Sequence, residues 1–167
     1  MSNKICIFII AVAIIIFASA QCIWADTGFW SAGAANPGDW SVANNWDGGT
    51  VADGDGNDAW FNVDVPTGGI ATINVDAGRA GQVIGNLNFL DSDVSTPGSY
   101  LVQGTTTLNL QNSGVGTSQI YVYPLFDPLG AELLAAEISA PMSVADGTSL
   151  TIVGNSGTGT LKLSGNT

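Results

Sequence analysis

Apolar and polar positions alternate over short stretches in the second half of the chain. In residues 71–75, Ala-Thr-Ile-Asn-Val, the apolar side chains share one face and Thr and Asn share the other. The alternation recurs at residues 86–89, 106–110, 119–122, 150–152 and 161–163. Gly, Asn, Asp and Ser residues, which favour turns, separate these segments. The pattern predicts an all-β chain of short strands without a long helix.

The outward amides and hydroxyls favour one arrangement of these strands. In a parallel coil the same position of successive turns is stacked, so Asn and Thr side chains can form hydrogen-bonded ladders. We therefore expect a right-handed parallel β-helix (a solenoid), with a β-sandwich as the alternative. Residues 91–98 are predicted to be a turn-rich excursion, and residues 125–136 an insertion that Pro128 and Gly130 limit to one helical turn.

The first 25 residues have the composition of an export signal. A lysine precedes an unbroken apolar run at residues 5–17, and the cleavage site is supplied by Ala18-Ser19-Ala20 or by Ile23-Trp24-Ala25. We expect cleavage after Ala25, with Ala20 as the alternative. A retained anchor fits the short run less well, and a lipid on Cys22 fits poorly with Gln21 before it. Both cysteines of the chain lie in this leader, so disulfides cannot stabilise the exported part.

The segment that follows, residues 26–64, is rich in tryptophan: Trp30, Trp40, Trp46 and Trp60. Turn-forming residues between the tryptophans predict short strands joined by β-turns. An open coil exposes the apolar interior of its first turn, so we interpret the segment as an N-terminal cap over solenoid strands at residues 65–167. A glycan-binding platform of the same four side chains is the alternative, because an indole face packs against the C–H face of a pyranose.

The charge balance narrows the classes of function. The chain has a formal net charge of −11, three Lys or Arg residues and no His. Such a chain repels phosphate backbones, so we exclude nucleic acid as a partner. The lack of His removes the commonest general base and zinc ligand, which disfavours Ser or Cys triads and His-based metal hydrolysis.

The most acidic stretch, residues 53–58, reads Asp-Gly-Asp-Gly-Asn-Asp. Oxygen-bearing side chains at alternate positions approximate a calcium loop, with Asp53, Asp55, Asn57 and Asp58 as ligands of a structural Ca²⁺. The sixth position of such a loop is normally Gly, but here it is Asp58. An acidic β-turn is therefore the preferred interpretation, and structural calcium is the alternative.

An enzymatic function would depend on carboxylates. Polysaccharide lyases with a parallel β-helix commonly pair acidic calcium ligands with a basic residue, and only Arg79 and Lys162 are available outside the leader. The 14 acidic residues give no basis for choosing two carboxyls at the roughly 5 to 9.5 Å separation that glycosidases use. We therefore predict that the protein is not an enzyme and has no catalytic residues.

Several stretches resemble one family of exported bacterial proteins. Residues 157–167, G-T-G-T-L-K-L-S-G-N-T, are similar to the approximate unit G-x-G-T-L-T-L-S-G-x-N-T of the autotransporter-associated β-strand repeat proteins, and residues 136–143 with 147–153 are a weaker version. Residues 40–49 and 56–61 resemble the W-x-x-x-x-N-W-x-G-G and G-D-D-A-x-F stretches that open such proteins. The resemblance implies a secreted or cell-surface β-helix with a structural, adhesive or passenger-like role.

Together these observations predict an exported structural or adhesion-type surface protein. The alternative is an extracellular glycan-binding module whose partner is a polysaccharide. The sequence shows no evident cap after the last strand, which predicts self-association through its edge.

Overall fold

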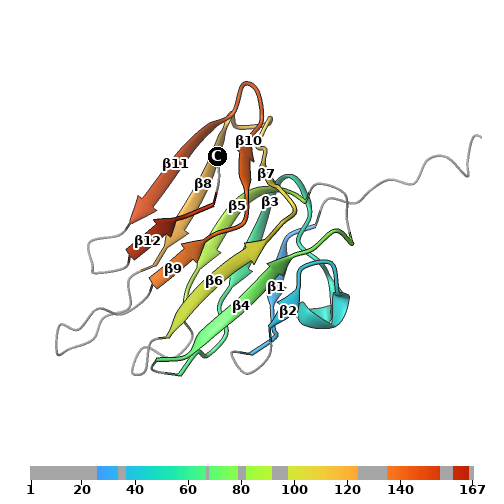
Figure 1. Cartoon of the computed structure of the whole chain (residues 1–167). Coiled ribbons are helices and arrows are strands. Elements are labelled where there is room, and N and C mark those ends of the chain that lie inside the picture. Colours follow the sequence, from blue (N-terminus) through green and yellow to red (C-terminus); the bar gives the residue numbers. More distant parts are fainter. Residues whose placement is uncertain are drawn as a thin grey trace, which may run out of the picture.

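The computed structural model describes residues 26–33, 37–66, 68–78, 82–91, 98–123, 135–154 and 160–165 (Figure 1). The predicted export signal lies outside these residues. In chain order the elements are β1 (Gly28–Trp30), β2 (Gly38–Asp39), the 3-10 turns η1 (Ala43–Asn45) and η2 (Asp47–Gly49), β3 (Gly54–Phe61), β4 (Ile70–Val75), β5 (Val83–Phe89), β6 (Ser99–Gly104), β7 (Leu108–Leu110), β8 (Thr117–Val122), β9 (Ala135–Ile138), β10 (Met142–Val144), β11 (Ser149–Gly154) and β12 (Thr160–Leu163).

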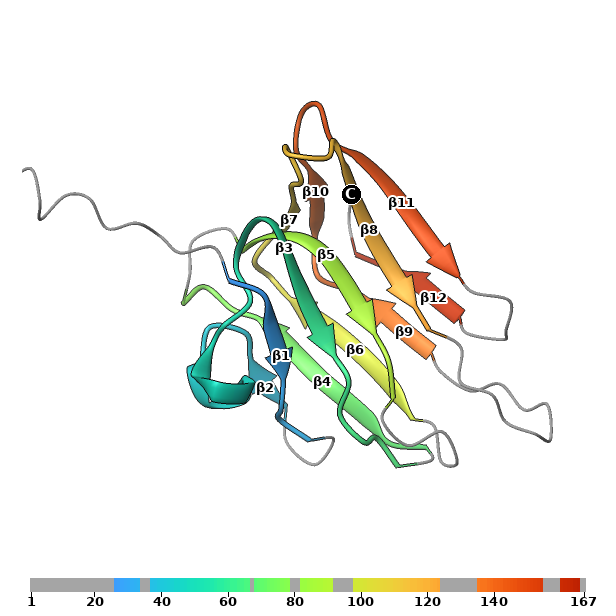
Figure 2. The same cartoon turned by 180° about the vertical axis from the view of Figure 1, so that it is seen from behind.

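The strands form two parallel sheets that face each other (Figures 1 and 2). Sheet one contains β1, β3, β5, β7, β8, β10 and β11, and sheet two has the order β12-β9-β6-β4-β2. From β3 to β6 the chain alternates between the sheets, and the strands of the two sheets run in opposite directions (Figure 2). The result is a β-solenoid of about three turns with almost no helix. The all-β solenoid prediction is confirmed, and the β-sandwich alternative is wrong because every strand pair in the sheets is parallel.

The strand register stacks apolar residues on apolar residues along the coil. Phe61 pairs with Phe89, and Phe89 pairs with Val122, so equivalent positions recur roughly every thirty residues. The first rung lies within the predicted cap segment, because β3 pairs with both β1 and β5. The earlier rungs contribute one strand to each sheet, whereas the later ones contribute two shorter strands, β7 with β8 and β10 with β11, to sheet one.

One interruption divides the first sheet. The start of β5 pairs with β7 and its second half pairs with β8, and residues 111–116 lie between those two shorter strands. The bulged start of β3 crosses β5 at Gly85, where a Cβ would lie 2.5 Å from the Gly56 carbonyl carbon. Because Gly85 has no side chain, the Gly56 N–H can donate to the Gln111 carbonyl at 2.9 Å.

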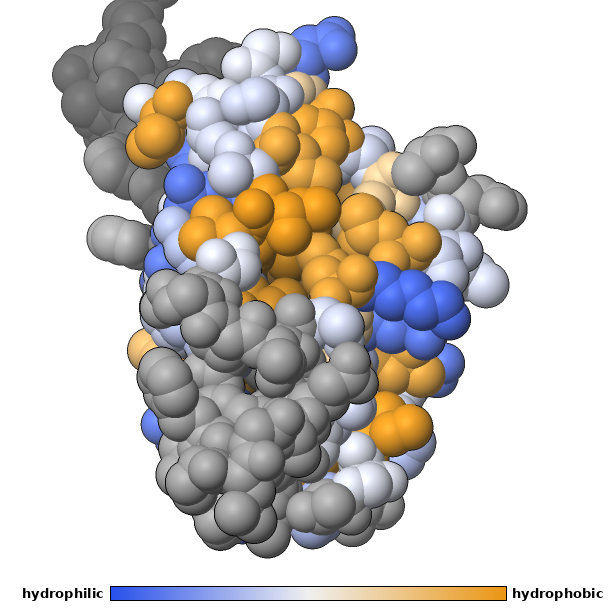
Figure 3. All heavy atoms as spheres, turned by 90° about the vertical axis from the view of Figure 1, so that its left-hand side faces the viewer, coloured by the Kyte–Doolittle hydropathy of each residue, from blue (hydrophilic) through white to orange (hydrophobic). Residues whose placement is uncertain are grey.

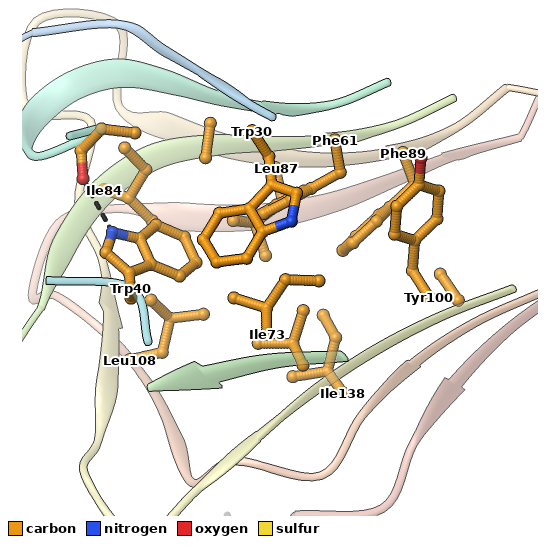
Figure 4. Packing of buried hydrophobic residues seen from close by; sticks show 14 of the residues in the cluster. Trp30, Trp40, Phe61, Ile73, Ile84, Leu87, Phe89, Tyr100, Leu108 and Ile138 are labelled. Atoms are coloured by element: carbon orange, nitrogen blue, oxygen red, sulfur yellow. Dashed lines mark hydrogen bonds between the residues drawn. The ribbon is translucent and has the colours of Figure 1, made fainter. Parts of the chain in front are cut away.

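The space between the sheets is filled by one apolar core (Figure 4). Ile73, Leu87, Leu108 and Ile120, which the alternation placed on inner faces, are fully buried, and Leu161 packs against the same cluster. The shared interior predicted from the sequence is therefore confirmed.

Other expectations had mixed outcomes. The alternation did not identify β6, and residues 54–58, within the stretch predicted to be a turn, form the bulged start of β3. Most of the predicted segments 91–98 and 125–136 lies outside the described residues, although β9 begins at Ala135. Across the described ranges, no helix has the length and apolar character to cross a membrane.

Candidate functional site

Three of the four tryptophans in residues 26–64 form a lid over the first rung. Trp30, Trp40 and Trp46 are 2%, 0% and 2% exposed, and the rings of Trp30 and Trp40 lie 5.1 and 5.3 Å from that of Trp46 at steep angles. The Trp40 indole N–H donates to the Ala52 carbonyl at 2.8 Å, and that of Trp46 donates to the Trp40 carbonyl at 2.7 Å. Buried rings offer no face to a sugar, so the glycan platform predicted from these three residues is wrong. They act as a cap.

The same segment also covers a strand edge. On the side of β1 away from β3, Trp30 forms an antiparallel bridge with Trp46, and the Ser31 N–H donates to the Asn45 carbonyl at 2.8 Å. The backbone between η1 and η2 thus occupies hydrogen-bonding positions that a further strand would use. We call this end of the coil the closed end.

Trp60 lies on the outer face of the first sheet, in a row of four rings. Phe29 stacks on Trp60 at 6.1 Å, Trp60 on Tyr123 at 6.1 Å and Tyr123 on Tyr121 at 5.6 Å, with interplanar angles of 17–22°. We call Phe29, Trp60, Tyr123 and Tyr121 the aromatic strip. Of the predicted glycan-binding residues, only Trp60 therefore lies outside the buried lid.

The strip covers an amide. Asn88 lies between Trp60 and Tyr121 in the strand register, and the Tyr123 ring stacks on both of these neighbours. Asn88 is 2% exposed, and its Nδ2 atom has no hydrogen-bond partner among the residues that the structure describes. Desolvation by this packing, and then the nearby Tyr121 and Asp58, raise the pKa of Tyr123.

Sequence reasoning identified only one member of the strip. Phe29, Tyr121 and Tyr123 come from other rungs, and no local motif connects them to Trp60. The register brings them together: Phe29 pairs with Trp60, and Asn88 joins Trp60 to Tyr121. The sequence could identify the aromatic strip only if the number of residues in each rung were known, because that number sets which side chains become neighbours.

A polar row runs beside the strip on the same face. The Asn86 amide donates to the Asp58 carboxylate at 2.6 Å, and the Gln119 N–H donates to the Asn86 side-chain oxygen at 2.9 Å. The Tyr121 hydroxyl donates to the Gln119 side-chain oxygen. In this row the predicted side-chain ladder is present between Asn86 and Asp58, and the next link comes from the Gln119 backbone N–H.

The predicted calcium ligands point to separate partners. The Asp53 carboxylate accepts from the Gln82 amide at 3.2 Å, and the Asn57 amide donates to the Asp53 carbonyl at 2.8 Å. The Asp55 carboxylate accepts from the Ser113 hydroxyl and N–H, which lower its pKa. Asp58 belongs to the polar row. Within the described ranges, no three or more His, Cys, Asp or Glu side chains form a group that could hold a metal ion, so the structure does not assemble the predicted site.

Two further carboxylates join parts of the fold. Partial burial alone would raise the pKa of Asp76, but hydrogen bonds from the Ser41 hydroxyl and N–H and the Gly78 N–H lower it. The Ser164 hydroxyl, and then Lys162 at 3.0 Å, lower the pKa of Glu137. Arg79, the other base named for a lyase-type site, lies outside the described residues.

A shallow hollow of about 300 Å³ lies at the start of the strands of sheet two. Its lining is mainly apolar and includes Ile70, Leu101 and Ala135, and its charged groups, Glu137 and Lys162, are already paired with each other. The hollow therefore offers shape without convergent polar groups, which a specific small-molecule site needs.

The chain matches no family model, no curated protein and no solved structure. The resemblance to the autotransporter-associated β-strand repeat proteins stays a prediction from the motifs quoted above.

Proposed function

We propose that this chain is an exported, non-catalytic β-solenoid that serves as a structural or adhesion-type scaffold at the cell surface or outside the cell. The observation that carries the proposal is how the outer polar side chains are used. In sheet two the Asn74 amide donates to the Asp39 carboxylate at 3.0 Å, and the Gln103 amide donates to the Asn74 side-chain oxygen at 3.0 Å.

On sheet one the Asn86 amide donates to the Asp58 carboxylate, and the Asn86 side-chain oxygen accepts from the Gln119 backbone N–H. Both rows join three successive rungs, so these carboxylates and amides stabilise the stack along the coil. A reaction centre would need such groups to converge on one accessible point. An extended fold held together by uncharged and acidic ladders supports a scaffold role.

Export is supported by the composition of residues 1–25 and by the resemblance of residues 157–167 to a family of exported repeat proteins. The test is fractionation of a bacterial host that expresses the chain, with mass spectrometry of the product. We expect a chain that begins at Asp26 outside the cytoplasm, whereas Ile14→Lys, which interrupts the apolar run, keeps the full-length chain inside. Full-length wild-type chain confined to the cytoplasm would contradict the proposal.

The scaffold role itself is tested with the purified chain. We expect β-type circular dichroism and no release of reducing ends or unsaturated products from a panel of polysaccharides. Turnover that Asp58→Asn abolishes would contradict the role, because that carboxylate would then be a reactive group.

A second candidate function, glycan binding, is favoured by the aromatic strip. The inner rings, Trp60 and Tyr123, are each stacked on two neighbours, so their faces are occupied. Phe29 is 44% exposed and stacks on Trp60. A pyranose would therefore pack on the outer face of Phe29, with the polar row nearby to accept hydrogen bonds.

This candidate is tested by a glycan array followed by tryptophan-fluorescence titration. Phe29→Ala should abolish saturable binding. Val42 in the lid segment is similarly exposed (42%), and Val42→Ala should leave the binding intact. If no polysaccharide gives a saturable signal with the wild-type chain, the candidate is rejected.

A further inference from the structure

The last rung exposes side chains that every earlier rung buries. In sheet one, Ala59, Leu87 and Ile120 occupy one column of the register and are 0% exposed, and the next member, Ile152, is 54% exposed. The pattern is repeated in sheet two, where Ile73, Val102 and Ile138 are 0% exposed and the next member, Leu163, is 41% exposed.

The strands β11 and β12 lie at the same end of the coil (Figure 1), and the view of the molecule from that side shows a band of apolar surface (Figure 3). The backbone edges there are also unused. Within the described structure, β10 pairs only with β7, β11 only with β8 and β12 only with β9. We call this face the open end; it combines apolar side chains with unpaired N–H and C=O groups, the two features of a site for strand addition.

Charge favours a second copy of this acidic chain at the open end. The chain as a whole has a net charge of −11, so contact between most of its surfaces would be opposed by repulsion. The strands β10, β11 and β12 contain no Asp or Glu, and their one charged residue is Lys162. Two open ends can therefore meet without bringing carboxylates of these strands together.

The closed end determines how two copies meet. Head-to-tail stacking would place an open end against β1, where the Trp46 bridge already occupies the edge. Contact between two open ends avoids this occupied edge, and such a contact between two copies is isologous and closes with two copies. The strands β11 and β12 run in opposite directions (Figure 2). A two-fold axis perpendicular to the coil axis therefore places each of these edge strands beside an edge strand of the second copy, and the two strands are antiparallel.

We infer that the open end is a homodimer interface, in which β11 and β12 of two copies continue both sheets across a two-fold axis. The exposed Ile152 and Leu163 side chains become buried in a core shared by the two chains. This inference goes beyond the scaffold role, because a monomeric scaffold would still be exported and inactive towards polysaccharides.

Sedimentation velocity and light scattering over a concentration series test the inference with the full purified chain. We expect a reversible monomer–dimer equilibrium in the wild type. Ile152→Asp should raise the dimer dissociation constant by at least about tenfold, because it would bury a charge. Leu163→Asp tests the second sheet independently, and Val42→Asp is the matched control at the closed end. Circular dichroism and thermal unfolding verify that each variant is folded.

Hydrogen exchange locates the contact. Amide protection of β11 and β12 should increase with protein concentration, and that of β1 should not. A wild-type chain that stays monomeric up to roughly 1 mM would overturn the inference and assign the open end to another occupant. Open-ended growth of the assembly, or equal dissociation by Val42→Asp, would overturn it as well.

Discussion

The two ends of the coil meet the same physical problem and differ in how they are built. Each rung of a solenoid is covered by the next, so the first and last rungs each leave one side of the core uncovered. At the closed end, Trp30, Trp40 and Trp46 cover the core, and the segment at Trp46 covers the edge of β1. At the open end, Ile152 and Leu163 take the positions of buried residues and remain exposed.

The difference shows that the repeating rungs cannot cover the end of the coil themselves, and that a cover needs a different structure. The lid is made of residue types and a chain direction that the rungs do not use: bulky indoles, two 3-10 turns and an antiparallel bridge. The last rung continues the rung pattern unchanged. Stability should therefore concentrate at the closed end, whereas changes at the open end should affect association more than folding.

The largest expected effect is the loss of a lid ring. Trp40→Ala should lower the free energy of unfolding by about 3–5 kcal/mol, because it leaves a large cavity in the core. It also removes the indole hydrogen bond to the Ala52 carbonyl, which then accepts, among the described residues, only from the Gln82 amide. Urea denaturation followed by circular dichroism, at a protein concentration that keeps the chain monomeric, measures the change.

The counterpart at the open end is Leu163→Ala. Leu163 is already partly in water, so its truncation should cost less than about 1 kcal/mol. Equal losses for the two variants would mean that the two ends contribute alike to stability.

A smaller effect is expected where the lid approaches β2. A Cβ at Gly38 would lie 2.7 Å from Cζ2 of Trp30 and 2.8 Å from Nδ2 of Asn45. Gly38→Ala must therefore shift the lid and should cost about 1–3 kcal/mol in the same denaturation experiment. Gly154→Ala in β11 is the control. Apart from its chain neighbours, no atom of the described residues lies within 4 Å of the added methyl there, so its effect should stay within about 0.5 kcal/mol.

The sequence predicted the interior better than the surface. Period-two alternation identified Ile73, Leu87 and Ile120 because burial on one face requires it. In β6 the alternation is obscured, since Leu101 faces outward between the inward Tyr100 and Val102, and the strand was missed. The density of tryptophan was enough to predict the lid but not which indole, Trp60, would lie outside.

Long-range pairing explains the remaining differences. Residues 53–58 have the composition of a turn, but Gly54 and Gly56 use positive φ angles to form a bulge in β3. The Asp55 carboxylate accepts a hydrogen bond from Ser113, which lies in the segment between β7 and β8, two strands away in the sheet. The aromatic strip likewise depends on unequal rung lengths. Such contacts are fixed by register, which local composition does not encode.

Acid should loosen the closed end by a modest amount. Asp76, at the end of β4, binds Ser41 in the lid segment, and these hydrogen bonds lower the carboxyl pKa from its ordinary value of 3.8. A pKa lowered in the folded state means that this stabilisation is complete above about pH 4 and is lost as the pH falls through the folded pKa. Solvent screening limits the effect to below about 1 kcal/mol.

Denaturation curves between about pH 5 and pH 2 measure this contribution. Asp76→Asn should be less stable than the wild type at the upper end of that range, and the difference should shrink towards the lower end. A difference that is constant over the whole range would show that the ionised carboxylate is not the stabilising form.

The smallest effect is expected from the ion pair beside the open end. Lys162 Nζ lies 3.0 Å from the Glu137 carboxylate, and the two side chains are 68% and 35% exposed. Water screens the pair, so a double-mutant cycle of Lys162→Gln and Glu137→Gln should give a coupling below about 0.5 kcal/mol that declines in high salt. A coupling well above about 1 kcal/mol would show that the pair is shielded from solvent, as in a dimer whose open ends are already joined. Repeating the cycle with Ile152→Asp in the background separates these cases, because a shielded pair would then lose its extra coupling.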